Sequence, residues 1–188
     1  KNLKNPDTKK KFDSNLEARQ HFFKIGNEFS KFMACTRNTA IIIGSNLFVH
    51  AAIVSKLAEK YKVNDINNLI RKWLLGELDQ NYKIDGIGKL SDILSNYEYS
   101  PFWPRILGQL PANVPLTDDI CVDSLKDTLK LYNVNNMIVG HTPQIFNKEQ
   151  NAINATCRDV EDGISKGVWR VDVGSSSGFD NYKNSELK

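Results

Sequence analysis

Two short apolar runs in distant parts of the chain each lead directly into a histidine. The sequence NLFV at 46–49 precedes His50, and MIVG at 137–140 precedes His141. Apolar runs of this length, bounded by small or turn-forming residues, predict short buried strands. In open α/β sheets, ligands bind beyond the carboxyl ends of the strands, so both imidazoles are expected at that edge. Neutral imidazole is the commonest side-chain ligand of transition metals, and the pair therefore predicts a shared metal ion.

The rest of the pattern predicts an α/β fold in a single domain over residues 1–188. The expected helices cover about 16–33, 51–61, 64–78 and 117–132, and the expected strands cover about 40–43, 47–49, 136–139 and 167–173. Residues 1–14 are expected to form a loose polar lead-in. Residues 79–116 hold four of the six prolines and show little periodicity, which predicts a substrate-side loop or insertion.

Composition argues against several kinds of partner. A net charge of +3 is too small to indicate nucleic-acid binding, and no stretch approaches the roughly 20 apolar residues of a transmembrane helix. Neither a nucleic acid nor a membrane is therefore expected as a partner. The three cysteines, Cys35, Cys121 and Cys157, lack CxxC or CxxH spacing and are expected to be thiols outside any disulfide framework or zinc site. The resulting expectation is a reducing, intracellular and cytoplasmic location.

Five segments carry a resemblance to a known family, and their order along the chain is also that of the family. They are FVHAA at 48–52, SPFWPR at 100–105, VGHTPQ at 139–144, Cys157, and WRVDVGSS at 169–176. Together they make most of residues 38–180 similar to the calcineurin-like metallophosphoesterases, and in particular to the branch of Shewanella-like protein phosphatases. GHTPQ combined with WRVDVGSS is the specific part of this match, whereas FVHAA or FWPR alone would be weak.

This resemblance implies a metal-dependent hydrolase of phosphate monoesters that is similar to serine/threonine protein phosphatases. In such an enzyme two divalent ions, which would be Mn, Fe or Zn, polarise the phosphoryl oxygens and lower the pKa of the attacking water. The implied partner is a phosphorylated protein or a small phosphate ester.

The resemblance also assigns roles to individual residues. His50 and His141 would bind the second metal ion through neutral ring nitrogens, and Arg105 would clamp the phosphate with its guanidinium. Hydrogen-bond support for the metal-bound rings is assigned to Thr142, Gln144 and Asp172. For Asp172 a second interpretation stays open, because a residue at a strand end also commonly bonds the nearby backbone.

Other parts of the family pattern are missing. The motifs GDxHG, GDxxDRG and GNHE, which carry the remaining ligands, the bridging aspartate and the proton donor, do not occur in the chain, and Ala51-Ala52 replaces two glycines. We therefore expect the C-terminal half of a metallophosphoesterase α/β sandwich, a mixed sheet flanked by helices that is incomplete at both ends. The chain alone is expected to be inactive, and its longer parent protein active.

Three other interpretations remain. Hydrolysis of a nucleotide or a diadenosine polyphosphate would use the same site, since specificity depends on loops that vary around a shared fold. A degenerate relative that binds without catalysis would keep the fold and lose half of the metal site. In a purely structural α/β domain, both histidines would simply be satisfied by hydrogen bonds.

Overall fold

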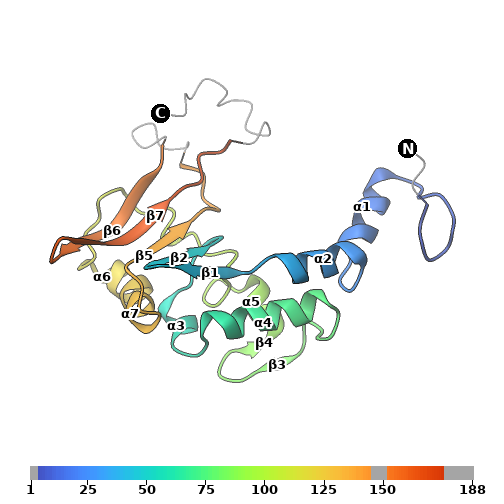
Figure 1. Ribbon diagram of the computed structural model, residues 1–188, viewed down its shortest axis with the longest axis horizontal. Helices are drawn as coiled ribbons and strands as arrows, with labels where there is room; N and C mark the ends of the chain where they lie inside the picture. The colour runs from blue at the N-terminus through green and yellow to red at the C-terminus, as the bar shows by residue number, and fades with distance from the viewer. Residues whose placement is uncertain (1–3, 145–151, 176–188) are drawn as a thin grey trace.

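A five-stranded mixed sheet organises the computed structural model, which describes residues 4–144 and 152–175 (Figure 1). The strand order is β1-β2-β5-β7-β6. The strands are β1 (Ala40–Ile43), β2 (Asn46–Val49), β5 (Asn136–Val139), β6 (Asn154–Glu161) and β7 (Ile164–Arg170). The inner strands β2, β5 and β7 run parallel to one another, while β1 and β6 pair antiparallel at the two edges. The carboxyl ends of the three inner strands therefore meet at one edge of the sheet, and the expected α/β class is confirmed.

Helices cover one side of this sheet. α3 (Ser55–Ala58) packs against a continuous helical segment made of α6 (Asp119–Cys121), the π-helical turn η1 (Val122–Lys126) and α7 (Asp127–Leu131). Figure 1 shows α3, α6 and α7 beneath the sheet, whereas α1 (Asn15–Phe23) and α2 (Glu28–Thr36) lead away from it. The other elements are α4 (Val63–Leu74), α5 (Leu90–Ser95) and the small hairpin β3 (Lys83–Ile84) with β4 (Gly88–Lys89). None of the helices in the described ranges is long and apolar enough to cross a membrane.

The two faces of the sheet differ in burial. On the covered face, Leu47, Met137 and Val168 lie side by side in register, and all three are fully buried. On the opposite face, the register aligns Ile41, Phe48, Ile138 and Trp169 in one row. Ile41 and Phe48 remain 43% and 38% exposed. The period-two alternation of strands thus produces one core face and one face that the described residues leave largely open.

Several expected elements differ from those observed. The helix expected over 16–33 is two helices, because Gly26 adopts a left-handed backbone with φ of 81° between them. The helix expected over 51–61 is reduced to α3. The region expected to be a loop before 167 contains β6, whose ladder with β7 shifts register between Thr156 and Asp159. This irregularity interrupts the alternation that would have predicted a strand.

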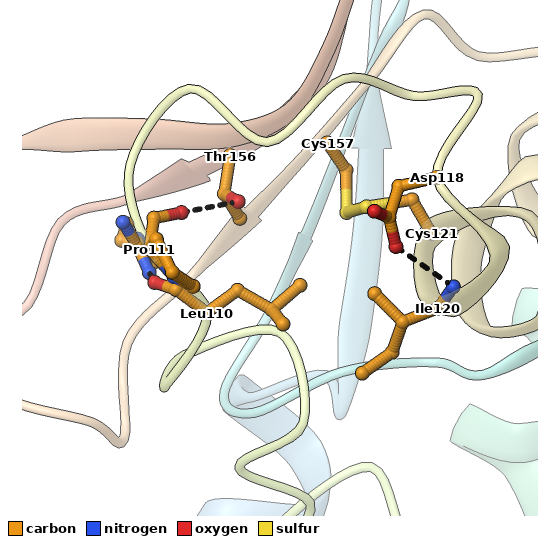
Figure 2. Close-up of a disulfide and its surroundings, with 8 residues drawn as sticks. Leu110, Pro111, Asp118, Ile120, Cys121, Thr156 and Cys157 are labelled. Carbon is orange, nitrogen blue, oxygen red and sulfur yellow. Dashed lines mark hydrogen bonds between the residues drawn. A yellow bond between two sulfur atoms is a disulfide. The ribbon is translucent and has the colours of Figure 1, made fainter.

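A disulfide joins Cys121 to Cys157, with a Cα–Cα distance of 5.4 Å (Figure 2). The prediction that these cysteines are thiols without a disulfide was wrong; Cys35 is the free cysteine and is exposed. The two sulfurs meet because residues 113–116 run beside β6 and are held there by backbone hydrogen bonds to 155 and 158. A pairing that depends on this long-range contact leaves no local spacing signal in the sequence.

Candidate functional site

The carboxyl ends of β2, β5 and β7 lead to three residues that were expected to belong to the site, His50, His141 and Asp172. Val49, Val139 and Arg170 are level in the ladders. The chain leaves these positions as His50, as Gly140-His141, and as Val171-Asp172. Backbone hydrogen bonds continue just beyond the strands, from the Gly140 N–H to the His50 carbonyl and from the Val171 N–H to the Val139 carbonyl, both 2.9 Å. The three segments are therefore held against one another where ligands bind in parallel sheets. A groove of about 320 Å³ opens beside His50 on the uncovered face of the sheet.

The two histidine rings are in direct contact. The Nε2 atom of His50 lies 3.0 Å from Nδ1 of His141, and the ring planes meet at 63°. One nitrogen must donate the proton and the other must accept it. His141 has a left-handed backbone with φ of 62°, a conformation that non-glycine residues seldom adopt and that is concentrated at functional sites. Its Nε2 atom is buried and has no hydrogen-bond partner among the described residues.

The surroundings of His141 favour its neutral form. Burial lowers the pKa of His141, and the nearby His50 and the positive charge of Arg105 lower it further. The Trp103 backbone and the charge of Asp172 act in the opposite direction but do not outweigh these effects. A neutral imidazole has a free lone pair at pH 7, so it can accept a proton from water or ligate a cation.

A loop that includes residues 100–110 brings further side chains to this edge. Arg105 is exposed, and its backbone N–H donates to the hydroxyl of Tyr97 at 2.9 Å. The ring of Trp103 contacts His141 edge to face, with centroids 5.8 Å apart, and is half exposed. Arg105 is thus close enough to His141 for its charge to lower the pKa of that ring, and its role as a phosphate clamp stays a prediction. No role for Trp103 was expected from the sequence, where the available signal is its position two residues before Arg105.

The residues expected to support the rings make other contacts. Gln144 is buried, and its Nε2 donates to the carbonyls of Gly108 and Thr142 at 3.1 and 2.7 Å. The backbone N–H of Gln144 donates to the carbonyl of Asp172 at 2.8 Å. The carboxylate of Asp172 accepts from the Gly174 N–H at 3.0 Å. These contacts of Thr142, Gln144 and Asp172 hold segments of loop backbone together. None of them reaches the ring of His50 or His141.

Metal binding at this site was the central chemical expectation. Among residues 4–144 and 152–175, no group of three or more His, Cys, Asp or Glu side chains is placed to hold an ion. The nitrogens of His50 and His141 are close enough to contact one ion, and their role as ligands stays a prediction.

Comparisons with known proteins place the chain beside one viral relative and a group of solved phosphatases. It is 35% identical to uncharacterized protein R398 of Acanthamoeba polyphaga mimivirus over 182 residues, covering 90% of this chain and 68% of that protein. A cold-active protein tyrosine phosphatase solved at 1.1 Å has a TM-score of 0.50 at 21% identity, over 78% of this chain and 36% of that one. Another structure of a cold-active protein tyrosine phosphatase, from a psychrophilic Shewanella species, has a TM-score of 0.45 at 22% identity, over 73% of this chain and 34% of that one. The chain thus spans about a third of the solved phosphatases that it matches. No family model matches the sequence.

These findings correct the family assignment made from the motifs. The assignment to the calcineurin-like metallophosphoesterases was wrong, because no model of that family matches and the structure that shares the fold is named a protein tyrosine phosphatase. The expected metallophosphoesterase activity with two divalent ions, Mn, Fe or Zn, is wrong on the same ground, and the described side chains form no three-ligand group.

Proposed function

This chain belongs to the family of the mimivirus protein R398, and we propose that members of this family hydrolyse phosphate monoesters at the carboxyl edge of the sheet. The observation that carries the proposal is the 3.0 Å approach of His50 Nε2 to His141 Nδ1 at that edge, beside Arg105. The shared fold with a cold-active protein tyrosine phosphatase supports the same class of substrate.

The side chains at this edge suit the chemistry of a phosphate monoester. A dianionic phosphoryl group needs a cationic partner, and the planar guanidinium of Arg105 can donate two parallel hydrogen bonds to it. The neutral pair of His50 and His141 keeps a lone pair that can accept the proton of a water molecule that attacks phosphorus. The bond from phosphorus to the ester oxygen then breaks, and the paired imidazoles can return a proton to the leaving alcohol. The products are inorganic phosphate and the free alcohol.

Trp103 narrows the substrate class. Its half-exposed ring stands against His141 and offers an aromatic surface beside the site of phosphate binding. An aromatic ring on the substrate could pack there edge to face or offset-stacked. We therefore propose aryl phosphates, including the phosphotyrosine side chain of a protein, as the favoured substrates.

The test is release of phosphate from four substrates: p-nitrophenyl phosphate, a phosphotyrosine peptide, a phosphoserine peptide and ATP. Both this chain and the whole mimivirus relative are assayed, because this chain covers 68% of that protein and was expected to be inactive alone. Replacing His141 by asparagine, which tolerates a left-handed backbone, should lower kcat by roughly 10²–10⁴-fold. The matched control in this chain is His21→Asn, since His21 lies on α1, away from this edge, and packs against Phe12.

The other outcomes replace the proposal with a named alternative. Preferential hydrolysis of ATP would indicate a nucleotide hydrolase. Binding of inorganic phosphate without turnover of any substrate by the whole relative would indicate a binding module. Equal rates for the wild type and the asparagine variant would remove His141 from the reaction.

A further inference from the structure

The last residue of β7 is a buried arginine. Arg170 is 1% exposed. Its Nε donates to Oδ1 of Asn154 at 2.6 Å, and its Nη1 donates to the carbonyl oxygens of Gly108, at 3.2 Å, and Leu110. Its Nη2 has no hydrogen-bond partner within the described ranges. Through these hydrogen bonds the guanidinium holds the loop at residues 108 and 110 and the start of β6 at Asn154.

These acceptors are all neutral oxygens. Burying a guanidinium is costly even when hydrogen bonds compensate for the lost water, and here burial lowers the pKa of Arg170. An apolar side chain of similar size would fill the same space without this cost. The arginine is thus better explained by what its fork of donors holds in place than by packing.

The loop contacts of Arg170 are shared with the segment that follows His141. The carbonyl of Gly108 accepts from Arg170 and also from Nε2 of Gln144 at 3.1 Å. Asn154 closes the network, because its Nδ2 donates to Oε1 of Gln144 at 3.1 Å while its Oδ1 accepts from Arg170. Four side-chain hydrogen bonds therefore connect the exit of β5, the start of β6, the end of β7 and the loop at 108.

Gly108 is also in close contact with the His141 segment. A Cβ atom at position 108 would lie 2.2 Å from Oγ1 of Thr142. Three residues before it stands Arg105, whose carbonyl accepts from the Gln109 N–H at 2.9 Å in a tight turn. A shift of the Gly108 carbonyl would therefore move the backbone of Arg105.

We propose that Arg170 is a positioning residue for the phosphate site: by holding the carbonyls of Gly108 and Leu110 and, through Asn154, the side chain of Gln144, it fixes Arg105 relative to His141. This inference rests on the proposed function for the role of Arg105, and it adds that a buried side chain outside the site sets its geometry. Arg170 does not touch the substrate.

The test compares Arg170→Met, Arg170→Lys and the control Arg158→Met. Arg158 lies on the neighbouring strand, where its guanidinium stacks 5.3 Å over the ring of Trp169 and bonds Ser165, outside the network. Two quantities are measured on each folded variant: hydrogen-exchange protection of the Gln109 amide, and the dissociation constant for inorganic phosphate followed by NMR. Arg170→Met should lose the protection and weaken phosphate binding by roughly tenfold to a hundredfold, because small misplacements are costly. Arg158→Met should change neither.

The Arg170→Lys variant distinguishes the effect of the hydrogen-bonding geometry of the guanidinium from the effect of its positive charge. Lysine keeps the cation but cannot span the three acceptors with one planar fork, so the proposal expects it to resemble Arg170→Met. A lysine variant that binds phosphate like the wild type would show that charge alone matters, and would overturn the proposal. Wild-type protection of Gln109 in a folded Arg170→Met variant would overturn it as well.

The same experiment remains decisive if Arg170→Met does not fold or if the wild type does not bind phosphate. If Arg170→Met does not fold, Asn154→Ala removes the link to Gln144, and it should reduce protection of Gln109 and phosphate affinity in the same direction. Unchanged values in that variant would count against the network. If the wild type does not bind phosphate, the proposed function fails, while the exchange comparison still decides whether Arg170 holds the loop.

Discussion

His50 Nε2 and His141 Nδ1 lie 3.0 Å apart, and His50 is one of the groups that lower the pKa of His141. Burial is the main reason why the pKa of His141 lies below its ordinary value, with His50 and Arg105 adding to the effect. In an NMR titration, the ring of His141 should therefore titrate below pH 6.5 or so, the usual value for histidine.

The same shift predicts how stability depends on pH. Because the unfolded chain binds a proton at His141 more readily than the folded chain does, the contribution of His141 is fully present above about pH 6.5 and is lost as the pH falls through its folded pKa. The measurement is the free energy of urea unfolding from pH 7.5 to 5 for the wild type and His141→Asn. Parallel curves for the two proteins would contradict the prediction.

Replacing Arg105 by glutamine should change the site in two ways. Removal of the positive charge raises the pKa of His141, since Arg105 lowers it in the wild type. Loss of a charge-assisted, bidentate donor should also weaken inorganic phosphate binding by roughly tenfold. Both effects can be followed in one NMR titration. The control is Arg37→Gln, because Arg37 is an exposed residue beside Phe32 at the end of α2. An unchanged His141 titration would place Arg105 outside the site.

The disulfide should contribute substantially to stability. Cys121 and Cys157 are 36 residues apart, and closing a loop of that length restricts the unfolded chain by about 4 kcal/mol on the chain-entropy estimate. The variant with both cysteines replaced by serine should lose free energy of unfolding of this order in urea. Thiol titration should find one reactive group, Cys35, before reduction and three after reduction and unfolding. Three thiols in the unreduced protein would exclude the bond.

Gly167 on β7 should tolerate no side chain. Its φ is +147°, and a Cβ atom would lie 2.7 Å from the carbonyl oxygen of Cys157. Gly167→Ala should therefore cost about 3 kcal/mol of unfolding free energy. Gly163→Ala is the matched control, because Gly163 also has positive φ but has nothing within 4 Å of the added carbon. That variant should lose about 1–2 kcal/mol. Equal losses would mean that the backbone near Cys157 adjusts to the new methyl group.

The strands that carry the two histidines were predictable because their apolar runs are local. NLFV and MIVG fall within one residue of β2 and β5, and the rule that parallel strands meet at one edge placed His50 and His141 together. Helix 117–132 was found for the same reason, although its π-helical turn was not.

Features that depend on distant contacts were missed. Cys121 meets Cys157 only after residues 113–116 have packed along β6, and nothing near either cysteine encodes this. The buried Arg170 looks like an ordinary polar position of an alternating strand until its acceptors, the carbonyls of 108 and 110, are brought beneath it. The family inferred from the motifs was wrong, and the motifs that suggested it lie mainly around the edge of the sheet.

Two kinds of attachment hold the residues of the candidate site. His50 and His141 follow inner strands of the sheet, whereas Arg105 belongs to a loop that lies outside the strand ladders and is held in part by the side chains of Gln144 and Arg170. Local openings of low energy occur where backbone contacts are few, so the loop should open at a lower temperature than the sheet melts. Warming would then abolish phosphate binding while the far-ultraviolet circular dichroism stays native. Loss of activity in a sample of this protein would therefore not show that the sheet has unfolded.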